Sequence, residues 1–382
     1  MIRNRTGQMV IGVGVMLVTL ALLSFFIIPH IPTQYTFLLV IAGIVFALSF
    51  FKPDLALVVL VFSMLLSPEY SAGAVQGRNV TIRADDVFLI VIFLGWMARM
   101  AVNKELGFLR KTSLNVAILI YSLVCIISTL YGYLKGYVVL HTGFFYFLKY
   151  FEYFLVFFLV TNNLKSKTQA KRFIFLILFV GLLASLIAWG QRVEGIARVS
   201  APFEGKGGES NTLGGYLVLV ISVAAGILLN TRTTRERVFS FGLIALAFPV
   251  VLFTLSRGSW LSMLLAILAL FFLSPRGKTV LFIGVLAAIL VAPMVIPRQV
   301  EERVKSTFVG PKKFKVGTQS ITLDESTTAR LDTWKHGFSA WVYEPVFGFG
   351  VSHAGPAFDN QYMRVLIETG IVGLFAFLLI IA

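Results

Sequence analysis

Runs of about 18 to 21 predominantly apolar residues recur along the chain, and they limit what it can fold into more than any other feature. As a helix, at 1.5 Å per residue, such a run crosses a hydrocarbon core of about 30 Å. Of the 382 residues, 58% are hydrophobic and 13% are charged, so a water-soluble fold could not bury the apolar surface. Membrane-spanning helices are therefore expected at 9–28, 35–51, 54–67, 86–101, 114–131, 142–161, 172–190, 211–230, 238–255, 258–274, 279–297 and 361–382.

This pattern predicts an all-α fold, a polytopic bundle of about 12 transmembrane helices with one long polar loop before the last of them. We divide the chain into helices 1 to 7 (1–190), helices 8 to 11 with their outer loops (191–297), an extracytoplasmic loop (298–360) and the last helix (361–382). The sequence stops at Ala382 within apolar residues, which leaves open whether a final tail is missing.

Positive charges are concentrated in one set of connections between these helices. The net charge is +15, from 33 basic and 18 acidic residues. If the N-terminus is cytoplasmic, the inner connections carry 16 of the basic residues and three acids, as the positive-inside rule requires. These basic residues are Arg3, Arg5, Lys52, Arg99, Lys104, Arg110, Lys111, Lys165, Lys167, Lys171, Arg172, Arg232, Arg235, Arg237, Arg276 and Lys278. Orientation in the membrane therefore accounts for most of the charge, and no nucleic-acid partner is expected.

The loop at 298–360 contains a second kind of helix. From Ser326 to Tyr343 the apolar residues recur at helical spacing and form one face, which consists of Leu331, Trp334, Phe338, Trp341 and Val342. Tryptophan favours the membrane interface, so we expect this amphipathic helix to lie on the outer membrane surface and to cover a cavity in the bundle. The single cysteine, Cys125, lies within a predicted span, which excludes a disulfide framework.

Four short motifs occur in the C-terminal half of the chain, near the ends of predicted helices. They are Leu255-Ser256-Arg257-Gly258-Ser259-Trp260; Arg330 and Trp334 followed by Pro345 and Gly348-Phe349-Gly350; Asp359-Asn360 followed by Gly370 and Gly373; and Arg198 followed by Pro202-Phe203 and Asn211. In this order, over about 190–382, they resemble the O-antigen ligase and polymerase superfamily. In that family's ligases a histidine occupies the position of Asp359.

The resemblance implies a GT-C-like membrane glycosyltransferase in the bacterial cytoplasmic (inner) membrane, with its active site on the outer face. Its partners would be a polyprenyl-diphosphate-linked glycan donor, a lipid or glycan acceptor and the membrane lipids. The implied reaction transfers or polymerises the donor glycan onto an acceptor hydroxyl, and it needs neither a metal nor another cofactor. We find no Asp-x-Asp signature and no nucleotide-sugar loop in the sequence.

The diphosphate leaving group requires fixed positive charge, and the planar guanidinium of arginine suits phosphate oxygens. Arg198, Arg257 and Arg330 are the candidates on the predicted outer side, and Arg364 is a further one. The family motif places the catalytic positions at Asp359 and Asn360. We expect Asp359 to be the general base, with His353 as the alternative.

Each of these residues also has a purely structural interpretation. Asp359 could cap the last helix, and Arg257 could anchor a helix end at the lipid headgroups. Arg330 could stack on Trp334, while Arg198 and His353 could be ordinary loop residues. The two glycines of the third motif, Gly370 and Gly373, are expected to allow close helix packing.

Two pairs of opposite charges lie within predicted spans, Lys149 with Glu152 and Arg364 with Glu368. Ionisable groups inside a membrane are costly unless paired, so we expect each pair to form an ion pair. Because Asn360, Arg364 and Glu368 share a helical face, a polar stripe could instead descend into the bundle and present Arg364 to the diphosphate.

Two other classes of function remain open from the sequence. A transporter or flippase for a lipid-linked glycan or a small solute would show inverted repeats and polar residues at mid-membrane, which we do not find. A scaffold would show no gathering of arginine and carboxylate on one face. Within the enzyme class, ligase and polymerase are not distinguished, although replacement of the histidine by Asp359 favours a polymerase or a divergent ligase.

Overall fold

The computed structural model describes residues 33–382, with gaps at 67–68, 76–77, 104–109, 203–207, 275–276, 280–281, 285, 287–297, 308, 310–311, 317–318 and 356–357. The predicted span at 9–28 and most of the span at 279–297 lie outside the described residues. The chain forms two compact units, 1–108 and 109–382, and each is described by itself.

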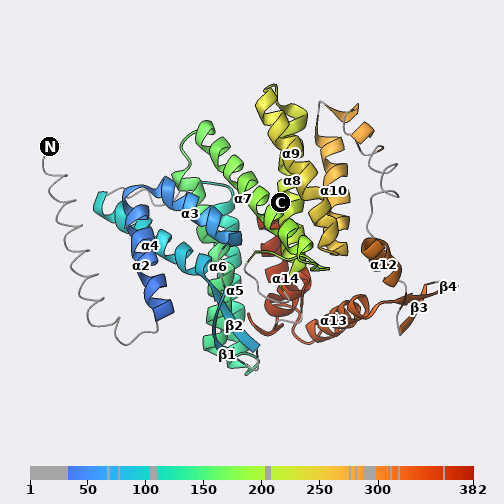
Figure 1. The fold of residues 1–382 in the computed structure, drawn as a ribbon. Helices are drawn as coiled ribbons and strands as arrows, with labels where there is room; N and C mark the ends of the chain where they lie inside the picture. The colour runs from blue at the N-terminus through green and yellow to red at the C-terminus, as the bar shows by residue number, and fades with distance from the viewer. Residues whose placement is uncertain are drawn as a thin grey trace, which may run out of the picture. The chain divides into compact units, whose positions relative to one another are not determined.

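The first unit contains three apolar helices and a hairpin (Figure 1). The helices are α2 (Thr33–Phe51), α3 (Pro53–Leu66) and α4 (Ala84–Asn103), and strands β1 (Glu69–Val75) and β2 (Arg78–Arg83) form an antiparallel pair between α3 and α4. Helices α2 and α4 approach closely because Gly95 has no side chain, and a Cβ there would lie 2.8 Å from Phe46 O. Ser49 Oγ donates a hydrogen bond of 2.6 Å to Ile92 O across this contact.

The second unit contains the remaining long helices. They are α5 (Leu114–Leu134), α6 (Leu140–Asn163), α7 (Lys167–Val193), α8 (Ser210–Asn230), α9 (Thr234–Phe253), α10 (Arg257–Leu273) and α14 (Gln361–Ile381). Among the described residues, six helices are long and apolar enough to cross a membrane, namely α5 to α9 and α14. Shorter apolar helices occur at Leu39–Phe51, Pro53–Leu66 and Arg257–Leu273.

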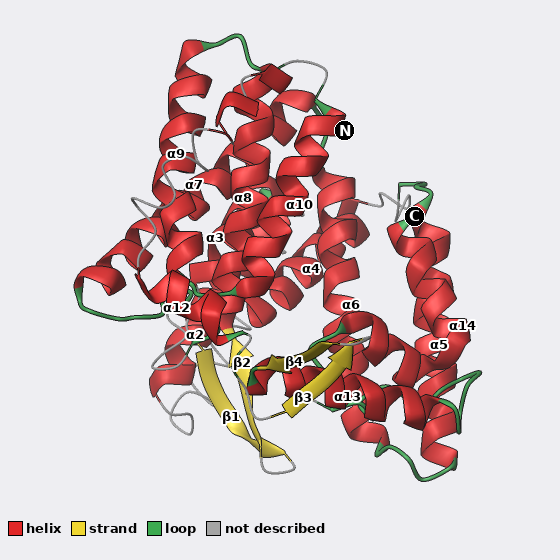
Figure 2. Ribbon diagram, turned by 90° about the vertical axis from the view of Figure 1, so that its right-hand side faces the viewer, coloured by secondary structure: helices red, strands yellow, loops and turns green. Residues whose placement is uncertain are grey.

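Small residues bring the helices of the second unit together. Gly181 of α7 faces Val220 of α8, and a Cβ on Gly214 of α8 would lie 2.3 Å from the Ser259 Oγ of α10. Figure 2 shows α8 and α10 side by side. Many side chains on the outer faces of these helices are exposed and apolar, as expected for surfaces that contact lipid.

The described residues between Arg298 and α14 form further helices and strands. They are α12 (Arg298–Ser306), a second antiparallel hairpin of β3 (Lys312–Val316) and β4 (Gln319–Leu323), and α13 (Glu325–Trp341). The amphipathic helix predicted from Ser326 to Tyr343 is therefore confirmed as α13, which lies crosswise to the long helices in Figure 1. A Cβ on Gly337 would lie 2.6 Å from Ile367 and Phe358, so α13 packs directly on α14.

Helix α14 is broken at Gly370, where φ is +65°. A Cβ at this position would lie 2.1 Å from Val346 O, so only glycine admits the passing loop. The main chain of the loop supplies hydrogen bonds at the break, because Phe349 N donates to Ile367 O and Ile371 N donates to Pro345 O. Gly370 was predicted to allow close packing between helices. It does allow close packing, but the partner is the loop that contains Val346 and not another helix.

The helical class predicted from the sequence is confirmed, but the count of about 12 spans is not, because six described helices meet the length and hydropathy required. The two hairpins were not predicted. One lies between the predicted spans at 54–67 and 86–101 and the other lies in the predicted loop at 298–360, and their strands of five to seven residues are too short to stand out in the sequence.

Candidate functional site

The Leu255-Ser256-Arg257 motif forms the turn between α9 and α10. Leu255 has a positive φ of 50°, which is unusual for a residue other than glycine and directs the chain sharply into the next helix. Ser256 is the N-cap of α10, and its Oγ accepts a hydrogen bond of 3.3 Å from Ser259 N. Arg257 is consequently the first residue of α10, at the end of the helix where its side chain can leave the bundle.

Arg257 connects this turn to the polar segment that follows. Its Nη2 atom donates to Asp324 Oδ2 at 2.8 Å, and its Nη1 atom donates to Thr307 Oγ1 at 3.0 Å. Asp324 is also the N-cap of α13, since its Oδ1 accepts from Thr327 N. The hydrogen bond from Arg257 lowers the pKa of Asp324 to about 2. Arg257 therefore holds the start of α13, and a carboxylate already compensates much of its charge.

Arg198 lies in the connection between α7 and α8, which is attached to the end of α9. Arg198 Nε donates to Thr254 O at 3.0 Å, and its Nη2 donates to Asn211 Oδ1 at 3.4 Å. The neighbouring Ser200 exchanges two hydrogen bonds with Gln191, which fixes this connection to the last turn of α7. The structure thus joins Arg198 and Asn211, two members of one predicted motif.

Arg198, Arg303 and Arg330 form a cluster of positive charge, which we call the arginine cluster. The pKa of Arg198 is lowered first by burial of its guanidinium and then by the positive charges of Arg303 and Arg330. Side chains that repel one another in this way are stabilised by an anion between them. Arg303 is in α12, Arg330 is in α13 and Arg198 precedes α8, so the charges that act on Arg198 come from two other segments of the chain.

Arg330 joins the arginine cluster to the start of α14. Its Nε atom donates to Asp359 Oδ2 at 2.6 Å, and the two side chains are 43% and 48% exposed. Asn360, rather than Asp359, caps α14, because Asn360 Oδ1 accepts from Tyr362 N at 3.0 Å and from Met363 N at 3.2 Å. The interpretation of Asp359 as the helix cap is therefore wrong, and its carboxylate is available for contacts outside the helix.

The two other predicted site residues have different surroundings. The His353 ring is stacked on Phe349, with centroids 4.4 Å apart, and its Nδ1 lies 3.3 Å from Tyr137 O. Arg364 Nη2 donates to Phe358 O at 2.6 Å, and the side chain is half-buried. Among the described residues, neither side chain forms a hydrogen bond with Asp359, whose partner is Arg330.

The predicted ion pairs within spans have different outcomes. Lys149 Nζ lies 3.3 Å from Glu152 Oε2, so this pair is confirmed. Arg364 and Glu368 do not form the expected ion pair. Arg364 instead binds a main-chain oxygen, and Glu368 accepts from the Tyr150 hydroxyl at 2.8 Å.

Reasoning from the sequence missed two residues of this region. Asp324 could have been found as the N-cap, because it directly precedes the helical pattern and is followed three residues later by Thr327. Arg303 was seen only as part of a charged stretch, and nothing in its spacing relates it to Arg198, which is more than 100 positions away.

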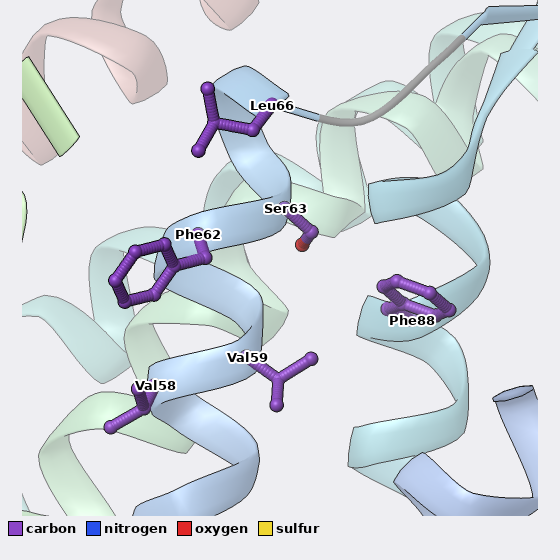
Figure 3. Close-up of a pocket in the computed structure, with 6 residues that line it drawn as sticks. All are labelled: Val58, Val59, Phe62, Ser63, Leu66 and Phe88. Carbon is purple, nitrogen blue, oxygen red and sulfur yellow. The ribbon is translucent and has the colours of Figure 1, made fainter. Parts of the chain in front are cut away.

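A pocket in the first unit is unrelated to these residues (Figure 3). It has a volume of about 350 Å³ and lies between α3 and α4. Its lining consists of Val58, Val59, Phe62, Ser63, Leu66 and Phe88. The one polar side chain, Ser63, donates its hydroxyl to Leu60 O within its own helix. This lining offers no charge for a phosphate.

The apolar helices and the polar residues gathered at the ends of α8, α10, α13 and α14 define a multi-helical membrane protein with one polar site. Residues 242–378 match the family described as O-antigen ligase, which confirms the resemblance over this part of the chain. The match includes Arg257, Arg303, Arg330 and Asp359, whereas Arg198 lies before it. The match covers 137 of the 382 residues, little more than a third of the chain. No curated protein and no solved structure was found to match the chain.

Proposed function

We propose that the protein transfers a glycan from a polyprenyl diphosphate to an acceptor hydroxyl, as an O-antigen ligase or a polysaccharide polymerase. The observation that carries this proposal is the Arg330–Asp359 pair beside the other two arginines of the cluster, with Arg303, Arg330 and Asp359 in the part of the chain that is similar to O-antigen ligases. A lipid diphosphate is the anion whose chemistry fits, since it combines two phosphates with a chain that lies in the membrane. The positive-inside orientation supports an outward-facing site in the inner membrane.

In this reaction the acceptor oxygen forms a bond to the anomeric carbon of the donor glycan. The bond from that carbon to the diphosphate breaks, and its electron pair leaves with the polyprenyl diphosphate. The acceptor proton passes to Asp359, which is on the exposed side of the start of α14. Arg198, Arg303 and Arg330 stabilise the charge on the diphosphate as it leaves, without a metal or another cofactor.

Arg257 has a different part in this proposal. Asp324 occupies its Nη2 atom and Thr307 its Nη1 atom, so its main contribution is to hold α12 and α13 over the site. Arg364 and Asn360 act similarly at α14, where Arg364 binds Phe358 O and Asn360 caps the helix. His353 serves as part of the aromatic packing of the loop.

The Arg330–Asp359 pair has a direct consequence for the proposed reaction. Arg330 cannot direct the same Nε–H to both Asp359 and a phosphate oxygen, and a carboxylate bound to a guanidinium is a weaker base. We propose that the donor diphosphate takes this Nε–H and so displaces Asp359 from Arg330. In the same step, the carboxylate becomes able to accept the acceptor proton.

The proposed function is tested by complementation in a bacterial strain whose own ligase or polymerase has been deleted. Asp359→Ala and Arg330→Ala should abolish the surface glycan seen on gels while the protein remains in the membrane. Loss of all attached glycan in the variants would identify a ligase, and attachment of single units without long chains would identify a polymerase.

The matched control is Arg232→Ala. Arg232 is exposed in the connection between α8 and α9, at the opposite end of α8 from the site, and its replacement removes the same charge. Normal glycan with this variant and none with Arg330→Ala would support the proposal. Normal glycan with all three variants would refute it.

A further inference from the structure

Glu368 is a buried carboxylate to which the proposed reaction gives no role. Its side chain is 2% exposed, in the part of α14 just before the break at Gly370. The Tyr150 hydroxyl of α6 donates to its Oε2 at 2.8 Å, and Ser352 N donates to its Oε1 at 3.1 Å. The carboxylate is therefore shared between a helix and the loop that precedes α14.

The main chain of Glu368 strengthens the same connection. Its carbonyl oxygen accepts from Gly350 N at 2.8 Å, and Ser128 Oγ of α5 lies 2.5 Å away. Four segments thus meet at one residue, namely α5, α6, the loop 345–355 and α14. Each of these partners is buried or half-buried, so their hydrogen bonds are shielded from water. They therefore hold the loop more firmly than an exposed ion pair would.

The loop held by Glu368 is strained. Ser352 has a φ of 85°, which is unfavourable for a residue other than glycine and persists only where the surroundings enforce it. Ser352 is the residue whose N–H binds the Glu368 carboxylate. Strained backbone of this kind is concentrated at functional sites, and here it lies seven residues before Asp359.

The loop also connects the two partners of the proposed site. It follows α13, which carries Arg330, and it precedes Asp359 by four residues in the sequence. Phe349 and Ala354 of the loop pack against Ile367, together with Ala340 of α13 and Phe358. Where the loop is fixed on α14 consequently sets the position of Asp359 relative to Arg330.

We propose that Glu368, held by Tyr150, is a positioning residue that fixes the loop 345–355 on α14 and so sets Asp359 opposite Arg330. Glu368 does not touch the substrate. It acts on the rate through the geometry of these two residues, and this role rests on the proposed function only for its effect on glycan transfer.

The geometry is tested without any substrate. Arg330→Cys and Asp359→Cys are combined with Cys125→Ala in the full chain in membranes, and the rate of cross-linking by a short bis-maleimide is measured. With native Glu368 cross-linking should be fast. Glu368→Gln keeps one acceptor oxygen and replaces the other by an NH2 group, which can donate to the Tyr150 hydroxyl oxygen, so cross-linking should slow by less than with Glu368→Ala. With Glu368→Ala it should slow at least fivefold, and with Tyr150→Phe it should slow by a smaller factor.

Glycan transfer is measured in parallel with native Arg330 and Asp359. Glu368→Ala should lower kcat at least tenfold with little change in KM, and Glu368→Gln should restore most of the loss. The control is Glu152→Ala, which removes a carboxylate of α6 that is paired with Lys149. Its kcat and its cross-linking should equal those of the wild type.

Unchanged cross-linking in both Glu368→Ala and Tyr150→Phe would overturn the positioning role. If Glu368→Ala does not accumulate as a folded protein, the cross-linking rate of Tyr150→Phe tests the positioning role. This variant removes the hydrogen bond to Glu368 and leaves the aromatic ring in the packing. The wild type could transfer no glycan while cross-linking is still slower in Glu368→Ala and Tyr150→Phe. That result would support the positioning role and refute the proposed function, so the two failures are distinguishable.

Discussion

Replacing Asp359 by alanine should increase the affinity of the arginine cluster for inorganic pyrophosphate while it abolishes glycan transfer. An ordinary catalytic residue would leave the binding of the leaving group unchanged. Here the affinity rises because Asp359 and the phosphate compete for Arg330, whose Nε lies 2.6 Å from Asp359 Oδ2. The variant does not remove the cap of α14, which is Asn360.

The size of the effect follows from the exposure of the pair. Side chains that are 43% and 48% exposed form a pair that is screened by water and contributes about 0.2–1 kcal/mol. Removing that competition should tighten pyrophosphate binding by a factor of about 1.4 to 5, at about 1.4 kcal/mol per tenfold. Arg330→Ala should weaken it by about 10- to 100-fold, from the loss of a charged hydrogen bond.

The measurement is titration calorimetry of purified protein in detergent with inorganic pyrophosphate, near physiological salt. Glu325→Gln is the control, because Glu325 is an exposed acid in the first turn of the same helix as Arg330 and its loss changes the overall charge equally. Its affinity should match the wild type. Equal affinity of wild type and Asp359→Ala would refute the competition. Absence of any binding by the wild type would refute the diphosphate site itself.

Three further changes test the framework of the site. Asp324→Asn should lower the Tm near neutral pH, since Arg257 loses its charged partner. The pKa of Asp324 in the folded protein is about 2, below its ordinary 3.8, so the wild type should lose this stabilisation as the pH falls from about 4 toward 2. The variant should lack that part of the pH dependence of Tm. Identical profiles of Tm against pH for the two proteins would contradict this role. Gly370→Ala should reduce the folded yield by fluorescence-detected chromatography, because its Cβ would meet Val346 O, and normal yield would show that the break is dispensable. Asn360→Ala should cost about 1 kcal/mol, measured by denaturant unfolding in detergent, and no change would exclude its role as cap.

How well the sequence predicts a contact in this structure depends on how far apart the two residues are along the chain. The spans and the amphipathic helix follow from local periodicity in the sequence. The caps of α13 and α14 are also local, because Asp324 and Asn360 directly precede the helices that they cap. The pairing of Arg257 with Asp324 joins residues 67 positions apart, and Tyr150 lies 218 positions from Glu368. Neither spacing has a signature, since a carboxylate can meet any donor that the fold brings to it.

The family motif nevertheless located Arg330 and Asp359, which the structure places in contact. A single sequence could not show that they contact each other, because the motif describes residues at fixed positions and not the loop between them. The hairpins were missed for a related reason, as their short strands pair only with each other and carry no long apolar run.

The break in α14 limits which segments can be exchanged between homologous proteins in a chimera. Main-chain groups released at Gly370 are satisfied by the loop at 345–350, through the hydrogen bonds of Ile371 N to Pro345 O and of Phe349 N to Ile367 O. In lipid, no water replaces those partners. A chimera that takes the long polar segment from one homologue and the final helix from another would leave that backbone without its matched partner. A chimera that folds should therefore take both segments from the same homologue, with its crossover point before Arg298.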